Sequence, residues 1–155
     1  MFESKYFTPN LTTKIIGQNL KYFKTTQSTN QEAWALNNKN NIENGTVLFT
    51  KNQTSGKGRR GNDWFSKNNK SLTFSILLHK DINELLPLIS GISVIAAIKK
   101  YTGVKCQLKW PNDIIYNNKK IAGILIEKKN NTSVIGIGVN VNENKNDLNP
   151  NIIKN

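Results

Sequence analysis

Three segments near the C-terminus have the composition of β-strands and are separated by only a few polar residues. Residues 113–116, 119–128 and about 132–142 are rich in isoleucine, leucine and valine. Asn117-Asn118, between the first two, is typical of a tight hairpin turn. Connections this short favour antiparallel neighbours, because a parallel pair needs a crossover of a dozen or more residues. The end of the chain therefore predicts neighbouring strands in a mixed or antiparallel sheet.

The upstream part of the chain alternates between helical and strand patterns. Residues 28–38 predict a helix, since Ser28 with Gln31, or Thr29 with Glu32, has the capping-box spacing. The other expected elements are strands over 46–51, 71–78 and 106–110, a helix over 84–101, and a polar, glycine-rich loop over 52–70. Strands that cluster after helix–strand alternation predict an α+β domain.

The loop over 52–70 is unusual, because a compact domain rarely keeps a long irregular segment that serves no function. Its centre, residues 56–61 (GKGRRG), holds the two arginines of a chain that otherwise carries 20 lysines. Guanidinium offers a rigid fork for phosphate or carboxylate, and glycines let the backbone approach such anions. Trp64 just beyond offers a flat apolar face for a base or another ring. We therefore expect an anion-binding loop, with solvated arginines and a core-packed tryptophan as the alternatives.

Two nucleotide-binding motifs fit this loop poorly. A dinucleotide fold needs a helix to begin at the glycines and an acidic residue about 20 positions further on. Here the loop runs into residues 62–66 and then into a strand. Gly56 and Gly61 have P-loop spacing, but Asn62-Asp63 stands where Lys-Ser/Thr is required. The sequence therefore argues against both a dinucleotide-binding motif and a P-loop.

Polar residues also gather where the C-terminal strands meet. Pro111 interrupts the run over 109–113 (KWPND) and exposes polar side chains at a strand junction. Lys120 precedes an apolar strand and can reach back into a pocket, although its position alone favours a solvated hairpin lysine. The run over 136–140 (GIGVN) places two glycines in a strand, which indicates close approach of backbone or ligand.

The formal net charge of +12 would ordinarily indicate a polyanionic partner. However, 25 Asn, 20 Lys and 18 Ile suggest an A/T-rich coding sequence, which enriches lysine whatever the function. We expect no DNA partner, and a steep salt dependence of binding would support the alternative. Cys106 is the one cysteine, so neither an intrachain disulfide nor a thiolate metal cage can form. The absence of a signal-peptide pattern or long apolar run predicts a cytoplasmic protein outside the membrane.

In their order along the chain, these motifs resemble those of biotin protein ligases over roughly residues 25–142. The motifs are Ser28-Thr29-Asn30, Gln53-x-x-Gly-Lys-Gly-Arg-Arg-Gly-x-x-Trp64, Lys109-Trp-Pro-Asn-Asp113, Lys120-Ile-Ala-Gly-Ile-Leu-Ile-Glu127 and Gly136-Ile-Gly-Val-Asn140. The resemblance implies a fold like that of class II aminoacyl-tRNA synthetases. In that fold a mixed, largely antiparallel sheet carries helices packed mainly on one face.

The resemblance also implies an activity. Biotin is activated with ATP and Mg²⁺ to biotinyl-5′-AMP with release of pyrophosphate, and biotin then passes to a lysine of a biotin carboxyl carrier protein. A truncated biotin-binding remnant and a lipoate-type ligase are the alternatives. A homodimer is among the expected assemblies.

Roles for individual residues follow from the same resemblance. The catalytic set would be Lys120, Arg59, Lys109 and Asp113, with Mg²⁺ near Asp113. The biotin-binding set would be Ser28, Thr29, Asn30, Gln53, Lys57, Gly58, Arg59, Lys120, Gly123 and Leu125. The ATP-binding set would be Gly56, Lys57, Gly58, Arg59, Arg60, Gly61, Trp64, Asn112, Lys120 and Asn140.

Two departures from the family pattern accompany the match. Lys57 and Asn62 stand where relatives usually carry arginine, which predicts weaker retention of the intermediate. We expect a catalytic domain over 1–142 and a flexible Asn-rich tail over 143–155. Neither an N-terminal helix-turn-helix domain nor the small C-terminal β-barrel of the family is expected.

Overall fold

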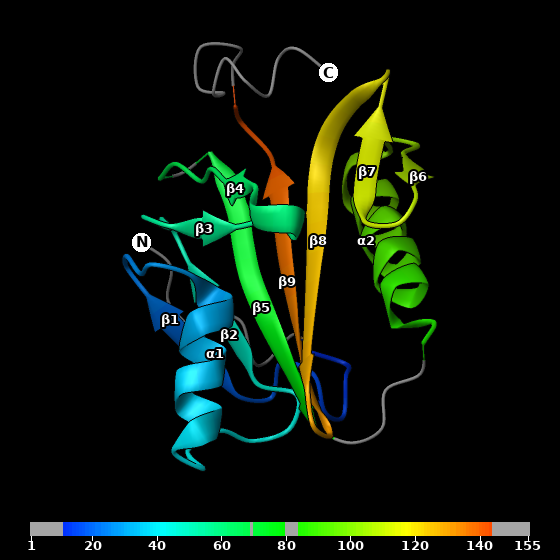
Figure 1. Ribbon diagram of the computed structural model, residues 1–155. Coiled ribbons are helices and arrows are strands. Elements are labelled where there is room, and N and C mark those ends of the chain that lie inside the picture. The colour runs from blue at the N-terminus through cyan, green and yellow to red at the C-terminus, as the bar shows by residue number, and fades with distance from the viewer. Residues whose placement is uncertain (1–10, 69, 80–83, 144–155) are drawn as a thin grey trace.

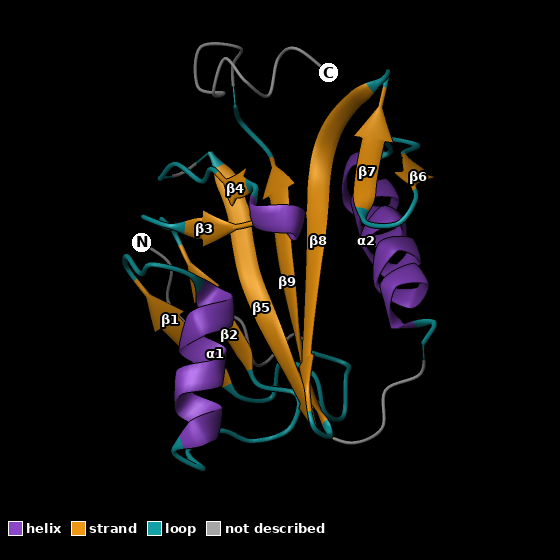
Figure 2. Ribbon diagram, viewed as in Figure 1, coloured by secondary structure: helices purple, strands orange, loops and turns teal. Residues whose placement is uncertain are grey.

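A seven-stranded sheet runs through the computed structural model, which describes residues 11–68, 70–79 and 84–143 (Figure 1). The strands lie in the order β1-β2-β5-β9-β8-β7-β6 (Figure 2). They are β1 (Leu20–Phe23), β2 (Val47–Thr50), β5 (Ser71–His79), β6 (Gln107–Lys109), β7 (Asp113–Tyr116), β8 (Lys119–Lys129) and β9 (Thr132–Asn140). β1 and β2 are parallel, and all other neighbours are antiparallel. The predicted mixed, largely antiparallel sheet is confirmed.

The hairpin between β7 and β8 forms where the two asparagines predicted it. Asn117 and Asn118 have φ values of 48° and 58°, the left-handed conformation that two-residue hairpin turns favour. β1 was not predicted, because its four residues are too few to show a pattern. The expected tail lies outside the described residues from position 144 onward.

The two helices, α1 (Thr29–Asn38) and α2 (Leu86–Thr102), lie on opposite faces of the sheet. On β9, Val134 is buried with Ala33 of α1, whereas the next residue, Ile135, is buried with Val94 of α2. Successive strand side chains point to opposite faces, so each helix covers its own face. The expectation that helices pack mainly on one face is therefore wrong for the described part. The reason is that the α1 face also carries an apolar patch, in which Leu48, Leu77 and Val134 are buried with Ala33.

Each helix takes a different part of the sheet. α1 packs against β2, β5 and β9, and α2 packs against β6, β7 and β8 (Figure 1). α2 has Pro87 in its first turn and ends at Thr102, and Gly103 follows as a left-handed C-cap with a φ of 74°. Neither described helix is long and apolar enough to cross a membrane.

The segment over 52–70, predicted to be a loop, contains short regular structure. β3 (Gly56–Lys57) and β4 (Asp63–Trp64) form an antiparallel ribbon, and the 3₁₀ turn η3 (Arg59–Gly61) joins them. The ribbon passes in front of the central strands in Figure 2. The polar composition of residues 52–70 gives no strand pattern, so these strands were not predicted. Trp64 packs on the main sheet and stabilises them.

Candidate functional site

One row of residues crosses the sheet on the face that carries α1. The strand register aligns Thr73 of β5 with Gly138 of β9, Gly138 with Gly123 of β8, and Gly123 with Asp113 of β7. No side chain rises from the two glycines, so a bay opens between Thr73 and Asp113. It forms part of a cavity of about 410 Å³.

The indole of Trp64 lies on the two glycines of this row. A Cβ atom added to Gly138 would lie 2.6 Å from the indole Nε1, and one added to Gly123 would lie 3.2 Å from Cζ3. The ring is therefore seated against bare backbone, which any larger residue would cover. Gly56 faces Trp64 across the β3–β4 ribbon and holds the strand that carries the ring.

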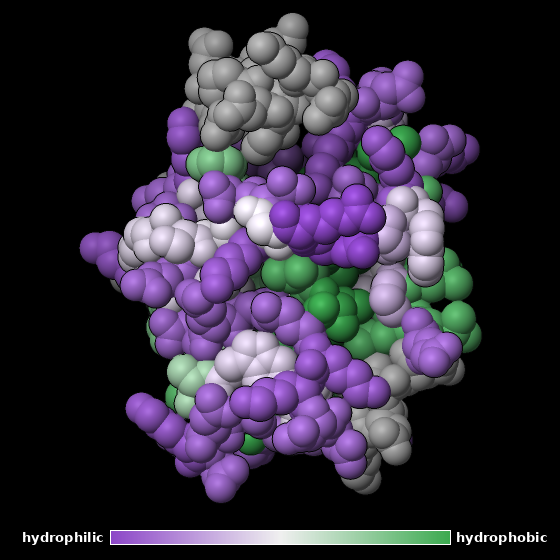
Figure 3. All heavy atoms as spheres, viewed as in Figure 1, coloured by the Kyte–Doolittle hydropathy of each residue, from purple (hydrophilic) through white to green (hydrophobic). Residues whose placement is uncertain are grey.

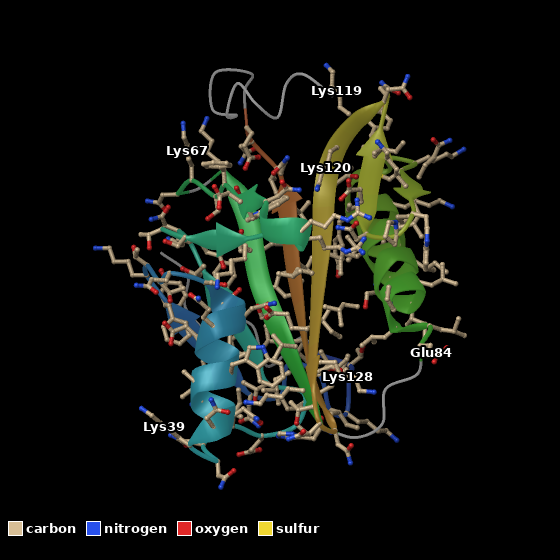
Figure 4. All side chains as sticks on the ribbon, viewed as in Figure 1. Lys39, Lys67, Glu84, Lys119, Lys120 and Lys128 are labelled. Carbon is tan, nitrogen blue, oxygen red and sulfur yellow. The ribbon has the colours of Figure 1, made fainter. Side chains whose placement is uncertain are left out.

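The cationic end of the cavity is formed by two side chains with partners of different kinds. Lys120 Nζ lies 2.7 Å from Asp113 Oδ1 and 5.8 Å from the centroid of the Trp64 ring. Arg59 Nη1 donates to Asn112 Oδ1 at 3.1 Å. Figure 4 shows Lys120 turned over the sheet, whereas the adjacent Lys119 points away from it. Cations outnumber carboxylates here, so the local field attracts anions.

The backbone of β8 fixes the position of Asn112. Its Nδ2 donates to the carbonyl of Ile124 at 3.2 Å, and its own carbonyl accepts the Ile124 N–H at 2.9 Å. Asn112 can therefore present Oδ1 to Arg59 in a set direction. Figure 3 shows a strongly hydrophilic band over η3, next to a hydrophobic area on the same face.

The other end of the cavity is neutral and polar, and the first turn of α1 supplies much of it. Gln53 Oε1 accepts from the Thr29 N–H at 2.8 Å and lies 3.2 Å from the Thr29 hydroxyl. The Ser75 hydroxyl lies 2.6 Å from both Thr29 Oγ1 and Asn30 Oδ1. Ser28 is the N-cap residue, yet its side chain makes no capping hydrogen bond. The capping box predicted for Ser28 with Gln31 is therefore wrong, and the side chain that binds a first-turn N–H is Gln53, at Thr29.

Glu127 on β8 completes this polar network. Its Oε2 accepts from Asn30 Nδ2 at 2.9 Å and from Trp34 Nε1 at 3.1 Å. Ser75 and Glu127 thus engage both ends of the Asn30 amide, which fixes the orientation of its side chain. A contact between Asn30 and biotin stays a prediction.

Most of the predicted site residues meet at this cavity. Those that line it are Ser28, Thr29, Asn30, Gln53, Lys57, Gly58, Arg59, Arg60, Trp64, Asn112, Asp113, Lys120, Gly123 and Leu125. Residues from both ends of the sequence come together because β5, β9, β8 and β7 are neighbours in the sheet.

A smaller group of predicted residues does not line the cavity: Gly56, Gly61, Lys109 and Asn140. Lys109 is exposed on β6 directly across from Asp113. Asn140 donates to the backbone carbonyl of Lys120 at 3.4 Å, so it lies beside the catalytic candidate rather than in the cavity.

Sequence reasoning assigned no ligand-binding role to several residues that do line the cavity, although it indicated close approach of backbone or ligand at two of them, Gly136 and Gly138. These lining residues are Asn62, Asp63, Thr73, Phe74, Trp110, Pro111, Ile124, Gly136, Ile137 and Gly138. The polar face of β5 was the available signal for Thr73, but alternation alone did not tell a cavity from solvent. Within the described ranges, no cluster of three or more His, Cys, Asp or Glu residues could hold a metal ion.

The chain is similar to proteins of one family along most of its length. The model of the Biotin/lipoate A/B protein ligase family matches residues 22–144. The bifunctional ligase/repressor BirA of Bacillus subtilis is 36% identical over 147 residues, covering 89% of this chain and 45% of the relative. The biotin–protein ligase of Homo sapiens is 30% identical over 135 residues, covering 81% of this chain and 19% of the relative.

Solved structures agree with this assignment. The biotin protein ligase from Aquifex aeolicus in complex with biotin and ATP has a TM-score of 0.77 at 36% identity, covering 88% of this chain and 57% of that one. The biotin acetyl coenzyme A carboxylase synthetase from Helicobacter pylori, with bound biotinylated ATP, has a TM-score of 0.72 at 31% identity, covering 82% and 63%. The chain spans about half the length of the Bacillus and Aquifex relatives. It belongs to the biotin/lipoate A/B protein ligase family, with the fold of the biotin protein ligase catalytic domain.

Proposed function

We propose that this chain activates biotin with ATP, forming biotinyl-5′-AMP and pyrophosphate, and then transfers biotin to a lysine of a biotin carboxyl carrier protein. The observation that carries the proposal is the polarity of the cavity. Ser28, Thr29 and Gln53 form a neutral hydrogen-bonding end, and Arg59 and Lys120 form a cationic end. Biotin has the matching order of groups, with a cyclic urea at one end and a carboxylate at the other.

The first step brings two anions together. A carboxylate oxygen of biotin attacks the α-phosphorus of ATP, and the bond from that phosphorus to pyrophosphate breaks. The cations of Arg59 and Lys120 offset the repulsion and stabilise charge on the phosphoryl oxygens. Asp113 holds the Lys120 ammonium 2.7 Å away, and Asn112 holds the Arg59 guanidinium, so both cations are positioned before substrate arrives.

Mg²⁺ would enter with the nucleotide. It typically keeps several waters and takes substrate phosphate oxygens with one or two carboxylates, so it needs no cage of protein ligands. Asp113 is the carboxylate proposed to face it, because it lines the cavity beside Lys120. The ion would neutralise phosphate charge. We place Lys109 and Asn140 in supporting positions next to Asp113 and Lys120, outside the cavity itself.

The second step needs protection of the intermediate, because biotinyl-5′-AMP is a mixed anhydride that water hydrolyses. The β3–η3–β4 segment contributes Lys57, Gly58 and Arg59 to the cavity wall and would exclude water there. The neutral amine of the carrier lysine then attacks the biotinyl carbonyl, AMP leaves with the electrons of the broken bond, and the nitrogen loses a proton to solvent as the amide forms. Lys57 and Asn62, in place of arginines, are proposed to hold the intermediate less tightly.

A lipoate-type ligase is the second candidate, because the fold is shared. LipL1 from Plasmodium falciparum, solved in complex with lipoate, has a TM-score of 0.56 at 16% identity, which concerns the fold alone. Lipoate has no urea, so it would leave the hydrogen-bonding groups at the neutral end without ligand partners. A protein that binds biotin without transferring it is the third candidate.

One assay separates these candidates. The purified chain is incubated with Mg²⁺, α-labelled ATP and either biotin or lipoate. The labelled adenylate is measured, and the unlabelled pyrophosphate is measured separately. A carrier domain is then added and its mass is recorded. We expect adenylate with biotin, little with lipoate, and a biotinylated carrier. A folded chain that forms no biotinyl-5′-AMP would overturn the proposal, whereas adenylate without transfer would restrict it to activation.

A further inference from the structure

The hydroxyl of Thr73 is buried at the cavity wall without a partner. The side chain is 3% exposed, lines the cavity, and makes no hydrogen bond to any described residue. Its neighbours on the same face differ from it. Ser75 contacts Thr29 and Asn30, and the Thr50 hydroxyl donates to the carbonyl of Asn52 at 3.0 Å. A buried hydroxyl without a partner destabilises a fold, so its presence needs an explanation.

A second unpartnered group lies close to it. Trp64 Nε1 is buried without a hydrogen-bond acceptor, and it lies 2.6 Å from the position that a Cβ of Gly138 would occupy. Gly138 is the residue directly opposite Thr73, and opposite residues have Cβ positions about 5 Å apart. In contrast, the indole nitrogen of Trp34 donates to Glu127. Two polar groups therefore lack partners at one spot in the cavity, and a polar ligand atom placed there would supply them.

We propose that Thr73 is a further ligand-binding residue, whose hydroxyl bonds the neutral polar ring of biotin beside Ser28, Thr29 and Gln53. The inference rests on the proposed function and adds a specificity residue to it. Thr73 lies two positions before Ser75, the residue that holds Thr29, so it belongs to the neutral end. β5 is separated from β8, which carries Lys120, by β9, a distance of about 10 Å at ordinary strand spacing.

The chemistry of the Thr73 hydroxyl agrees with a position at the neutral end of the cavity. A hydroxyl can donate to a urea carbonyl or accept from a urea N–H, whereas it adds no charge for binding phosphate. Thr73 therefore discriminates in favour of ligands with a neutral donor or acceptor at the ring and contributes little to ATP binding.

Thr73→Val tests the inference, because valine keeps the shape and removes the hydroxyl. We expect the melting temperature of the ligand-free protein to rise, since an unpartnered polar group is lost. The Kd for biotin, measured by titration calorimetry, should rise about fivefold to tenfold, the size of one neutral hydrogen bond. Thr73→Ser retains the hydroxyl and should keep the biotin Kd within about twofold.

Thr46→Val is the matched control. Thr46 is 1% exposed, and its hydroxyl donates to the carbonyl of Glu43 at 2.7 Å, away from the cavity lining. This variant should lower the melting temperature and leave the biotin Kd unchanged.

Each contrary result has its own meaning. A lower melting temperature for Thr73→Val would show that the hydroxyl has a partner in the free protein and would overturn the inference. Biotin binding that is equal in wild type and Thr73→Val would also overturn it, while leaving the proposed function standing. Wild-type protein that binds no biotin would overturn the proposed function and this inference together.

Discussion

The seat of Trp64 on Gly138 predicts strong energetic coupling between two residues that are far apart in the chain. In Gly138→Ala, the new Cβ would lie 2.6 Å from the indole Nε1 and nearer still to Cε2 and Cζ2. Atoms of this size rest about 3.5–4.0 Å apart, so the ring must move by about 1 Å or more. The ring cannot simply retreat with β4, because Trp64 is paired with Gly56 in the ribbon.

The expected loss of stability follows from overpacking. Adding a methyl group against a rigid ring costs about 1–3 kcal/mol in the free energy of unfolding. For a domain of this size the melting temperature should fall by about 2–4 °C for each kcal/mol. Urea denaturation of wild type and Gly138→Ala measures the loss. Biotin affinity should fall as well, because the displaced indole would move within the cavity that we propose binds biotin.

A double-mutant cycle decides whether the indole is the cause. In a Trp64→Ala background the ring is gone, so Gly138→Ala should cost no more than about 0.5 kcal/mol. Gly91→Ala is the matched control, because its added Cβ would meet a flexible atom, Leu108 Cδ1, at 2.7 Å on the other face of the sheet. Its cost should be the same in both backgrounds. If Gly138→Ala also cost the same in both, the indole would not be seated on Gly138 and the reasoning would be refuted.

Three further perturbations have expected outcomes. Lys120→Ala removes one partner of an ion pair whose lysine side chain is 40% exposed. The free energy of unfolding should therefore change by no more than about 1 kcal/mol. Adenylate formation by this variant should fall about 100-fold to 1000-fold. Lys119→Ala is the control, because the Lys119 side chain points away from the sheet (Figure 4). An equal loss of adenylate formation in both variants would contradict the role proposed for Lys120. Glu127→Ala leaves two side-chain N–H donors without their acceptor and should cost about 2–4 kcal/mol in urea denaturation, so an unchanged midpoint would count against the network. Burial raises the pKa of the Cys106 thiol, so iodoacetamide should react with the folded chain more slowly than with the urea-unfolded chain at pH 8, and equal rates would contradict this.

The sheet could be predicted because its signals are local. The alternation over 71–78 and the asparagine turn at 117–118 each depend on residues close in sequence, and both elements formed near the predicted bounds. The two helices were also found within a few residues of their expected ends. The face that each helix covers has no local signal in the sequence, since it depends on how β5, β9 and β8 pair. The expectation that the helices pack mainly on one face was therefore wrong.

The polar side of β5 shows where pattern reasoning ends. Thr73 and Ser75 alternate with apolar residues, which predicts a half-buried strand with a solvent side. Yet they are 3% and 0% exposed, because α1 and the β3–β4 ribbon cover that side. Alternation tells which residues share a face, whereas only the tertiary arrangement tells what lies above that face.

The glycines of β8 and β9 also show that the tertiary arrangement decides what lies above a face of the sheet. Glycine weakens a strand interior, so Gly123 and Gly138 are unfavourable choices for β8 and β9 in themselves. The sequence predicted close approach by backbone or ligand at the second of them. The first group to approach is in fact part of the protein, the indole of Trp64, which uses the space that two absent side chains leave. The register that sets these glycines between Thr73 and Asp113 therefore determines the length of the bay, and β9 separates the strand of Thr73 from the strand of Lys120.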